Sequence, residues 1–104
     1  MKVEVQYING CPNHWATVEL IRQVMGELAV NAELLETEIA DFENAHIGFL
    51  GSPTVRVNGL DVEPAAWGSS PAGYGCRSYA NGSKRQGFPS AQMIRDAIDR
   101  ARAV

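Results

Sequence analysis

Hydrophobic and polar residues alternate from Lys2 to Ile8, which predicts a β-strand at the start of the sequence. After Cys11 the hydrophobic residues recur at spacings of three and four, which predicts a helix from Pro12 to Val30. Its expected apolar stripe comprises Trp15, Val18, Ile21, Met25 and Leu28. Pro12 suits the first helical position, where its missing N–H leaves no hydrogen bond unmade, and Cys11 then falls at the N-cap. Asn31 is the expected stop, because asparagine tolerates a left-handed conformation.

The middle of the sequence predicts a strand, a short helix and a hairpin. Residues Glu33 to Ile39 alternate again and follow the first helix after a short turn, so the two strands should run parallel. Asp41 can cap a short helix from Phe42 to Ile47. The β-rich run Thr54–Val57 ends at Asn58-Gly59, a dipeptide typical of a tight type I′ hairpin turn.

The last part of the sequence predicts short strands, a loop and a final helix. We expect a strand from Leu60 to Glu63, then a loop rich in Pro, Gly, Ser and Ala, and a second short strand around Cys76 that ends at Asn81-Gly82. Ser90 is the expected cap of the final helix. Its inward face comprises Ile94, Ala97, Ile98 and Ala101. The order of the main elements is β-α-β-α-β-β-α, which predicts an α/β fold.

Length and composition indicate one globular domain over residues 1–104, with 45% hydrophobic residues. The net charge of −3 gives no general attraction to nucleic acid or anionic lipid, so neither nucleic acid nor a membrane is expected as a partner. Up to Ser52 the chain carries −6 and after it +3, which we interpret as two oppositely charged faces. No run of about 18 apolar residues predicts a membrane span, and the start is unlike a signal peptide, so we expect a cytoplasmic protein.

Two cysteines, Cys11 and Cys76, are too few for the disulfide framework of a small secreted protein. In a reducing compartment such thiols are reactive, metal-binding or simply buried. A thiolate at Cys11 would accept N–H groups at the start of the helix, and the positive end of the helix dipole favours it. His14 either strengthens this effect as a hydrogen-bond donor or is an ordinary surface histidine.

Cys76 has two alternative roles. It reaches Cys11 as a resolving thiol if its loop folds across the end of the sheet, whereas a strand that begins at Cys76 would place it at the opposite end. A disulfide requires Cα atoms about 4.4 to 6.8 Å apart. In the other role Cys76 packs as a small buried hydrophobic residue.

Two short motifs resemble the thioredoxin-like superfamily: Cys11-Pro12-Asn13-His14 at the strand-to-helix junction and Ser52-Pro53-Thr54 before the third strand. The resemblance implies a three-layer sandwich, with a central four-stranded mixed sheet and helices on both faces. It also implies a cis peptide bond at Pro53, beside a reactive Cys11. Thioredoxins carry a second cysteine three residues after the first. His14 stands at that position here, so Cys11 cannot form that local disulfide.

Residues 10–13, 48–64, 75–79 and 87–90 are similar to a group of small bacterial thioredoxin-like proteins that are often labelled alkylmercury lyase. This similarity implies thiol chemistry and soft-metal chemistry of the kind used in mercury resistance. The predicted catalytic residues are Cys11, Cys76, His14 and Pro53. The predicted substrate-binding residues are Pro12, Ser52 and Thr54.

Three functions fit these residues. As a thiol–disulfide oxidoreductase, Cys11 attacks a protein or small-molecule disulfide, and Cys76 or glutathione resolves the mixed disulfide without a cofactor. As a soft-metal module, Cys11 and Cys76 bind Hg(II) or Cu(I), whereas a zinc site that adds His14 and His46 lacks any recognised spacing. In the third hypothesis the chain is an inactive interaction protein that keeps the fold without the chemistry.

Overall fold

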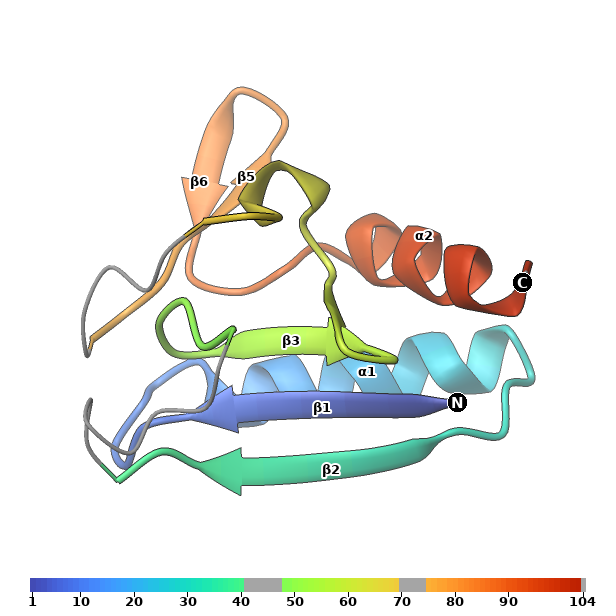
Figure 1. Ribbon diagram of the computed structural model, residues 1–104, viewed down its shortest axis with the longest axis horizontal. Helices are drawn as coiled ribbons and strands as arrows, with labels where there is room; N and C mark the ends of the chain where they lie inside the picture. The colour runs from blue at the N-terminus through green and yellow to red at the C-terminus, as the bar shows by residue number, and fades with distance from the viewer. Residues whose placement is uncertain (41–47, 70–74, 104) are drawn as a thin grey trace.

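Six strands, two helices and one 3₁₀ turn form the regular structure of the computed structural model, which describes residues 1–40, 48–69 and 75–103. In chain order they are β1 (Lys2–Tyr7), α1 (His14–Glu27), β2 (Glu33–Glu38), β3 (Thr54–Val57), β4 (Leu60–Asp61), η1 (Pro64–Ala66), β5 (Tyr79–Asn81), β6 (Lys84–Gln86) and α2 (Ala91–Arg102) (Figure 1). The short helix predicted from Phe42 to Ile47 lies outside the described residues.

Four of the strands form a mixed sheet in the order β2-β1-β3-β4 (Figure 1). β1 and β2 are parallel, joined through α1, and β3 runs antiparallel to both β1 and β4. The turn between β3 and β4 has positive φ values of 49° at Asn58 and 84° at Gly59, as a type I′ turn requires. The α/β class, the four-stranded mixed sheet and the hairpin are therefore confirmed, although β4 is shorter than the predicted strand from Leu60 to Glu63.

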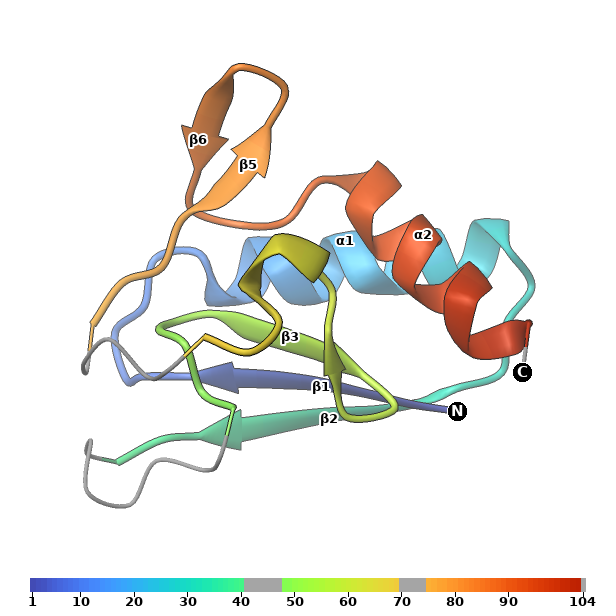
Figure 2. The same ribbon diagram turned by 45° about the horizontal axis from the view of Figure 1, so that its top comes forward.

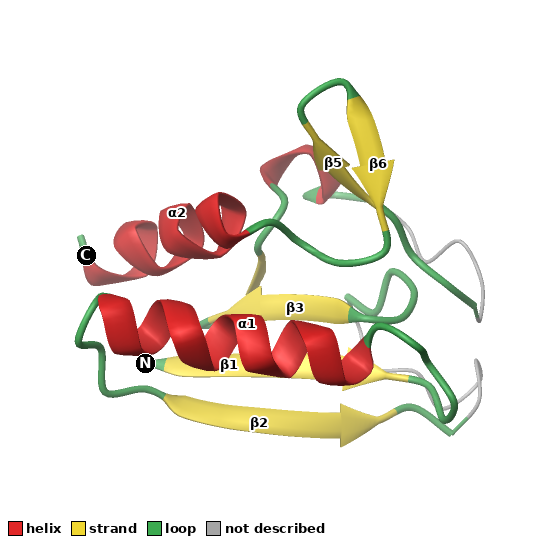
Figure 3. Cartoon of the chain, turned by 180° about the vertical axis from the view of Figure 1, so that it is seen from behind, coloured by secondary structure: helices red, strands yellow, loops and turns green. Residues whose placement is uncertain are grey.

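The core lies on one face of this sheet, beneath both helices. Val3 and Val5 of β1 lie opposite Val57 and Val55 of β3, so all four side chains share that face. From α1 and α2 the core receives Val18, Ile21, Val24, Ile94, Ala97 and Ile98. Figure 3 shows the two helices on this side of the sheet, where they contact one another. The sequence predicts helices on both faces, whereas the two helices that the structure describes share one.

Helix α1 begins two residues later than predicted. Asn13 is its N-cap, so Cys11 and Pro12 precede the helix, and the prediction of Cys11 at the N-cap is wrong. The His14 N–H donates to the Cys11 carbonyl oxygen over 3.4 Å, which turns the chain before the helix starts. Trp15, predicted to lie in the core, is 68% exposed, because the neighbouring His14 takes the position that faces the sheet.

Helix α1 also ends earlier than predicted. Ala29 adopts the left-handed conformation, with a φ of 52°, and its N–H donates to the Gly26 carbonyl. The Val30 N–H donates to the Met25 carbonyl. These two hydrogen bonds form a Schellman motif, which ends the helix before it reaches Asn31, the predicted stop.

Strands β5 and β6 form a hairpin that the sequence pattern does not predict. They pair antiparallel, with Asn81 opposite Lys84 across a two-residue turn, and Gly82 in that turn has a φ of 63°. Asn81-Gly82 therefore belongs to a hairpin turn, where the prediction placed the end of a single strand. Figure 2 shows this hairpin standing away from the four-stranded sheet.

Helix α2 begins where the sequence predicts. The Ser90 hydroxyl accepts a hydrogen bond from the Met93 N–H over 3.1 Å, so Ser90 is the N-cap. Ile94, Ala97 and Ile98 are buried. The predicted inward face and the predicted cap of this helix are confirmed.

Candidate functional site

Cys11 lies in the turn between β1 and α1, where its side chain is half-buried. Its backbone N–H donates to the Ile8 carbonyl oxygen over 3.1 Å. Because Asn13 caps α1, Cys11 stands two residues before the cap. The field of a helix falls off beyond its first turn, so the helix N-terminus acts on this thiol from farther away than predicted.

Ser52 links this turn to the start of β3. Its buried hydroxyl accepts a hydrogen bond from the Ile8 N–H over 3.0 Å. The peptide bond between Ser52 and Pro53 is cis, as expected. Ile8 therefore holds the Cys11 turn through its carbonyl oxygen and the Ser52-Pro53 loop through its N–H.

Cys76 lies beside Ser52, with which it forms an isolated parallel bridge. The Ser52 N–H donates to the Gly75 carbonyl over 2.8 Å, and the Arg77 N–H donates to the Ser52 carbonyl over 3.0 Å. The Cys76 segment and the Cys11 turn thus lie at the same end of the sheet (Figure 1 and Figure 2). The alternative placement at the opposite end is wrong, and the predicted strand around Cys76 is reduced to one bridge. Both cysteines are free, and Cys76 is exposed, so it is not a buried hydrophobic residue.

The buried side chain of Arg77 anchors the segment that carries Cys76. Its guanidinium donates to the two carboxylate oxygens of Asp61 over 2.6 and 2.7 Å, and lies 3.6 Å from the Glu63 carboxylate. Its central carbon lies 4.1 Å from the centre of the Tyr79 ring. We call Asp61, Glu63, Arg77 and Tyr79, all buried, the Arg77 cluster. Bidentate pairing fixes both the position and the direction of a guanidinium, so the cluster holds Cys76 in place.

Burial and charge act in opposite directions on the Arg77 cluster. Burial alone would lower the pKa of the Arg77 guanidinium, but its hydrogen bonds to Asp61, together with the electrostatic effect of Tyr79, Asp61 and Glu63, outweigh burial and raise that pKa. Burial raises the pKa of the Tyr79 hydroxyl far above its usual value. This hydroxyl donates to the Pro53 carbonyl. A charged Arg77 and a neutral Tyr79 therefore fasten the Cys76 segment to the proline loop.

The His14 ring contacts two residues of the sheet, Glu36 and Tyr7. Its Nε2 lies 2.7 Å from a carboxylate oxygen of Glu36 on β2, and its ring stacks on Tyr7 with 3.6 Å between ring centres. In the part of the chain that the structure describes, no hydrogen bond joins the His14 ring to Cys11. His14 is therefore fixed near the Cys11 turn by Glu36 and Tyr7, and its predicted action on the thiol stays a prediction.

The three predicted substrate-binding residues differ in exposure. Pro12 is exposed at the surface of the Cys11 turn, whereas Ser52 and Thr54 are buried. The Thr54 hydroxyl donates to the Gly51 carbonyl and accepts from the Leu50 N–H, and so shapes the proline loop. Pro12 is the member of this set that a bound molecule can touch without displacing part of the chain.

The loop after β6 packs against Asn13, next to the Cys11 turn. The backbone of Gly87 lies against Asn13, so closely that a Cβ at Gly87 would fall 2.3 Å from the Asn13 side-chain nitrogen. Residue 87 must therefore lack a side chain for this contact to form. Trp15, stacked on His14 with 4.8 Å between ring centres, is exposed in the first turn of α1, directly after the Cys11 turn.

Sequence reasoning missed Asp61, Glu63, Arg77 and Glu36 as parts of this site. A signal for two of them was present, because Asp61 and Glu63 are two residues apart in a β-rich segment and so share one face, opposite to Val62. Two carboxylates on one buried face need a cationic partner. Nothing in the local sequence indicates that Arg77 is that partner.

Within the described residues, no group of three or more His, Cys, Asp or Glu side chains is placed to hold a metal ion. His46, which the zinc hypothesis requires, lies outside those residues. Neither α1 nor α2, the helices in the described part of the chain, is long and apolar enough to span a bilayer.

Comparison of the sequence and structure with known proteins gives no match to a protein-family model, to a curated protein or to a solved structure.

Proposed function

We propose that this chain is a thioredoxin-like thiol–disulfide oxidoreductase, with Cys11 as the nucleophile and Cys76 as the resolving thiol. The hydrogen-bonded path from Cys11 through Ile8 and Ser52 to the Cys76 segment carries the proposal. It supports the proposal because a resolving thiol must come within disulfide distance of the nucleophile. The mixed sheet and the proline loop next to the Cys11 turn support the thioredoxin-like fold.

The reaction uses two thiol–disulfide exchanges. The Cys11 thiolate attacks one sulfur of a substrate disulfide, forms a mixed disulfide and expels the other sulfur as a thiolate, which takes a proton from water. The Cys76 thiolate then attacks the Cys11 sulfur and expels the second substrate thiolate. The substrate gains two electrons, and Cys11 and Cys76 lose two by forming a disulfide. Glutathione or a cellular dithiol returns the pair to the reduced state.

The substrate approaches from the exposed side of the Cys11 turn, where Pro12 lies, next to the exposed Trp15 of α1. Strand pairing with Ser52 is already taken by the chain itself, because both backbone groups of Ser52 bond to residues 75 and 77. Protein disulfides and small-molecule disulfides therefore meet Cys11 through side-chain contacts on this turn.

Titration with an aromatic disulfide that has a coloured leaving thiolate tests the order of the steps. The reduced wild-type protein should release two leaving thiolates per chain and end with a Cys11–Cys76 disulfide. Cys76→Ser should release one and keep the aromatic adduct on Cys11, as seen by mass spectrometry. Cys11→Ser is the matched control, since it also keeps one cysteine, and its exposed Cys76 should react more slowly.

Two outcomes would overturn the proposal. If the wild-type protein ends with separate adducts on Cys11 and Cys76, then Cys76 does not resolve the mixed disulfide. If Cys11→Ser reduces insulin as fast as the wild type, then Cys11 is not the nucleophile and the inactive interaction protein is favoured.

A soft-metal module is the second candidate, favoured by the presence of two free cysteines at one end of the sheet. Two thiolates suffice to bind Hg(II) or Cu(I), because soft sulfur ligands select soft metals. Native mass spectrometry of the reduced protein with Hg(II) should then show one tight adduct that either single Cys→Ser variant loses. A wild-type protein that binds no tighter than these variants would exclude this candidate.

A further inference from the structure

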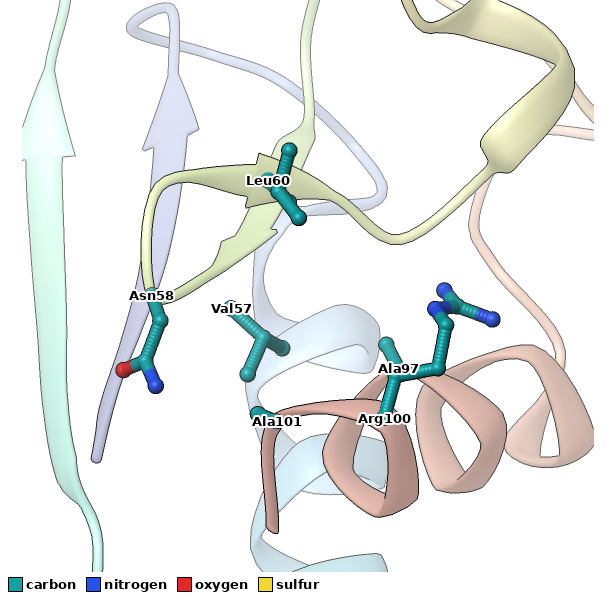
Figure 4. Close-up of a pocket in the computed structure, with 6 residues that line it drawn as sticks. All are labelled: Val57, Asn58, Leu60, Ala97, Arg100 and Ala101. Carbon is teal, nitrogen blue, oxygen red and sulfur yellow. The ribbon is translucent and has the colours of Figure 1, made fainter. Parts of the chain in front are cut away.

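A cavity of about 250 Å³ lies between the β3–β4 hairpin and the C-terminal half of α2. Its lining residues are Val57, Asn58, Leu60, Ala97, Arg100 and Ala101 (Figure 4). It lies at the opposite end of β3 from the Cys11 turn, since Ser52 precedes β3 and Asn58 follows it. This cavity is therefore separate from the thiol site.

The walls of the cavity are apolar. Val57 and Ala97 belong to the buried core, and Ala101 packs against it. Leu60 is 55% exposed, so its side chain is open to a molecule bound in the cavity. Figure 4 shows these side chains between Asn58 on one side and the Arg100 guanidinium on the other. An apolar chain can replace water along these walls, which is favourable in proportion to the area covered.

Arg100 gives the cavity a single positive charge. No carboxylate of the described residues lies within ion-pair distance of its guanidinium, which instead lies 5.4 Å from the centre of the exposed Trp67 ring. Most arginines in the same part of the chain have such a partner: Arg95 pairs with Glu27 and Arg102 with Asp99. The Arg100 charge is therefore available to a bound anion.

A neighbouring cavity, also lined by Arg100, differs from the first in charge. It is lined by residues that include Asp96 and Ser90 as well as Arg100. The Asp96 carboxylate would repel an anion there, whereas the first cavity has no acidic residue in its lining. An anion on Arg100 is thus favoured on the side of Val57 and Leu60.

We propose that this cavity binds a small aliphatic monocarboxylate, with its chain along Val57, Leu60 and Ala97 and its carboxylate on Arg100. The size supports a short chain, because pockets for drug-sized ligands measure about 300 to 1,000 Å³. A guanidinium binds a carboxylate through two parallel hydrogen bonds, which gives the preference for this head group.

Methyl NMR of the wild-type protein tests this site with octanoate as the probe. Octanoate should shift the methyl signals of Val57, Leu60, Ala97 and Ala101 and leave those at the Cys11 end unchanged. Octanol should bind about tenfold more weakly, since it lacks the charge-assisted hydrogen bonds, and octylammonium more weakly still.

Two arginine variants make a matched pair for this test. Arg100→Gln should lose the preference for octanoate over octanol. Arg102→Gln, which removes the same charge from a residue of α2 outside the cavity lining, should keep it. Ala101→Leu, which fills part of the cavity, should weaken octanoate and octanol alike.

Three results would overturn the proposal: no methyl shifts at the cavity, equal binding of octanoate and octylammonium, or an equal effect of Arg100→Gln and Arg102→Gln. None of these results bears on Cys11, so the two proposals fail or stand separately.

Discussion

Arg77 stays charged in the interior because two buried carboxylates pair with its guanidinium. Asp61 accepts both of its short hydrogen bonds, and Glu63 adds a second negative charge at 3.6 Å. Glu63 in turn accepts from the Ala80 N–H over 2.9 Å, so the carboxylates are themselves held. Removing the cation would leave both of them buried and unpaired.

Arg77→Met should therefore destabilise the protein by about 3 to 5 kcal/mol. Arg77→Lys keeps the charge but loses the bidentate geometry, so its loss should be smaller. Urea denaturation gives both free energies of unfolding. Arg85→Met, at an exposed arginine of the β5–β6 hairpin, is the control and should change stability by less than about 0.5 kcal/mol. Equal losses for Arg77→Met and Arg85→Met would contradict the role of the cluster.

Tyr79 gives a pH dependence with a definite sign. Its raised pKa keeps the hydroxyl neutral in the folded protein, while the unfolded chain ionises at about pH 10. The folded state then holds one more proton than the unfolded state, so stability falls as the pH rises above about 10. The free energy of unfolding should fall more steeply for the wild type than for Tyr79→Phe between about pH 9 and 11. Parallel curves for the two proteins would show that Tyr79 does not contribute.

Among the elements, α1 shows how far hydrophobic periodicity determines a helix. The pattern predicts the helix and the burial of Val18 and Ile21, which the structure confirms. It places Trp15 in the same stripe, because it cannot show that the helix starts at His14 and that this histidine has Glu36 as a partner on β2. The error arises from a contact between residues far apart in the sequence.

The α2 cap offers a test at the scale of one element. Ser90→Ala removes the acceptor of the Met93 N–H, so it should destabilise the protein by about 1 kcal/mol. Thermal or urea unfolding measures the loss. Ser83→Ala replaces an exposed serine in the β5–β6 turn and should have little effect. A loss at Ser90 no larger than that at Ser83 would show that the cap contributes nothing.

For the whole molecule, the sequence predicts the class of fold and the order of most elements, because strands, helices and turns leave local patterns. It also predicts that Cys11 and Pro53 lie close to strand ends. It does not predict the Arg77 cluster or the pairing of Ser52 with Cys76, since both join segments that are distant in the sequence. The sequence therefore predicts the site only in part. The contacts that it does not predict are those between segments far apart in the chain.

Strand β2 is an edge of the sheet, paired only with β1 among the described residues. An open edge can pair with another chain, and charged side chains oppose this. Glu33 and Glu38, both exposed, carry such charge at its two ends. The double variant Glu33→Thr/Glu38→Thr should therefore self-associate more than the wild type in sedimentation velocity experiments.

The control for this variant removes the same two charges from the helices, as Glu19→Gln/Asp96→Asn, both exposed. It should remain as monomeric as the wild type. If both double variants associate equally, net charge alone prevents self-association, and the charges on the edge of β2 do not contribute more than others.

Asp61 makes two contacts that hold the segment leading to Cys76, one with Trp67 and one with Arg77. Its backbone carbonyl accepts a hydrogen bond from the Trp67 indole over 2.8 Å, and its carboxylate holds Arg77. Between these two ties lies Gly68, around which a Cβ would meet no atom within 4 Å. An insertion after Gly68 lies between these two ties, so it should leave both hydrogen-bond sets on Asp61 intact. A peptide displayed at this position should therefore leave Cys76 in place, because Arg77 beside it stays bound to Asp61.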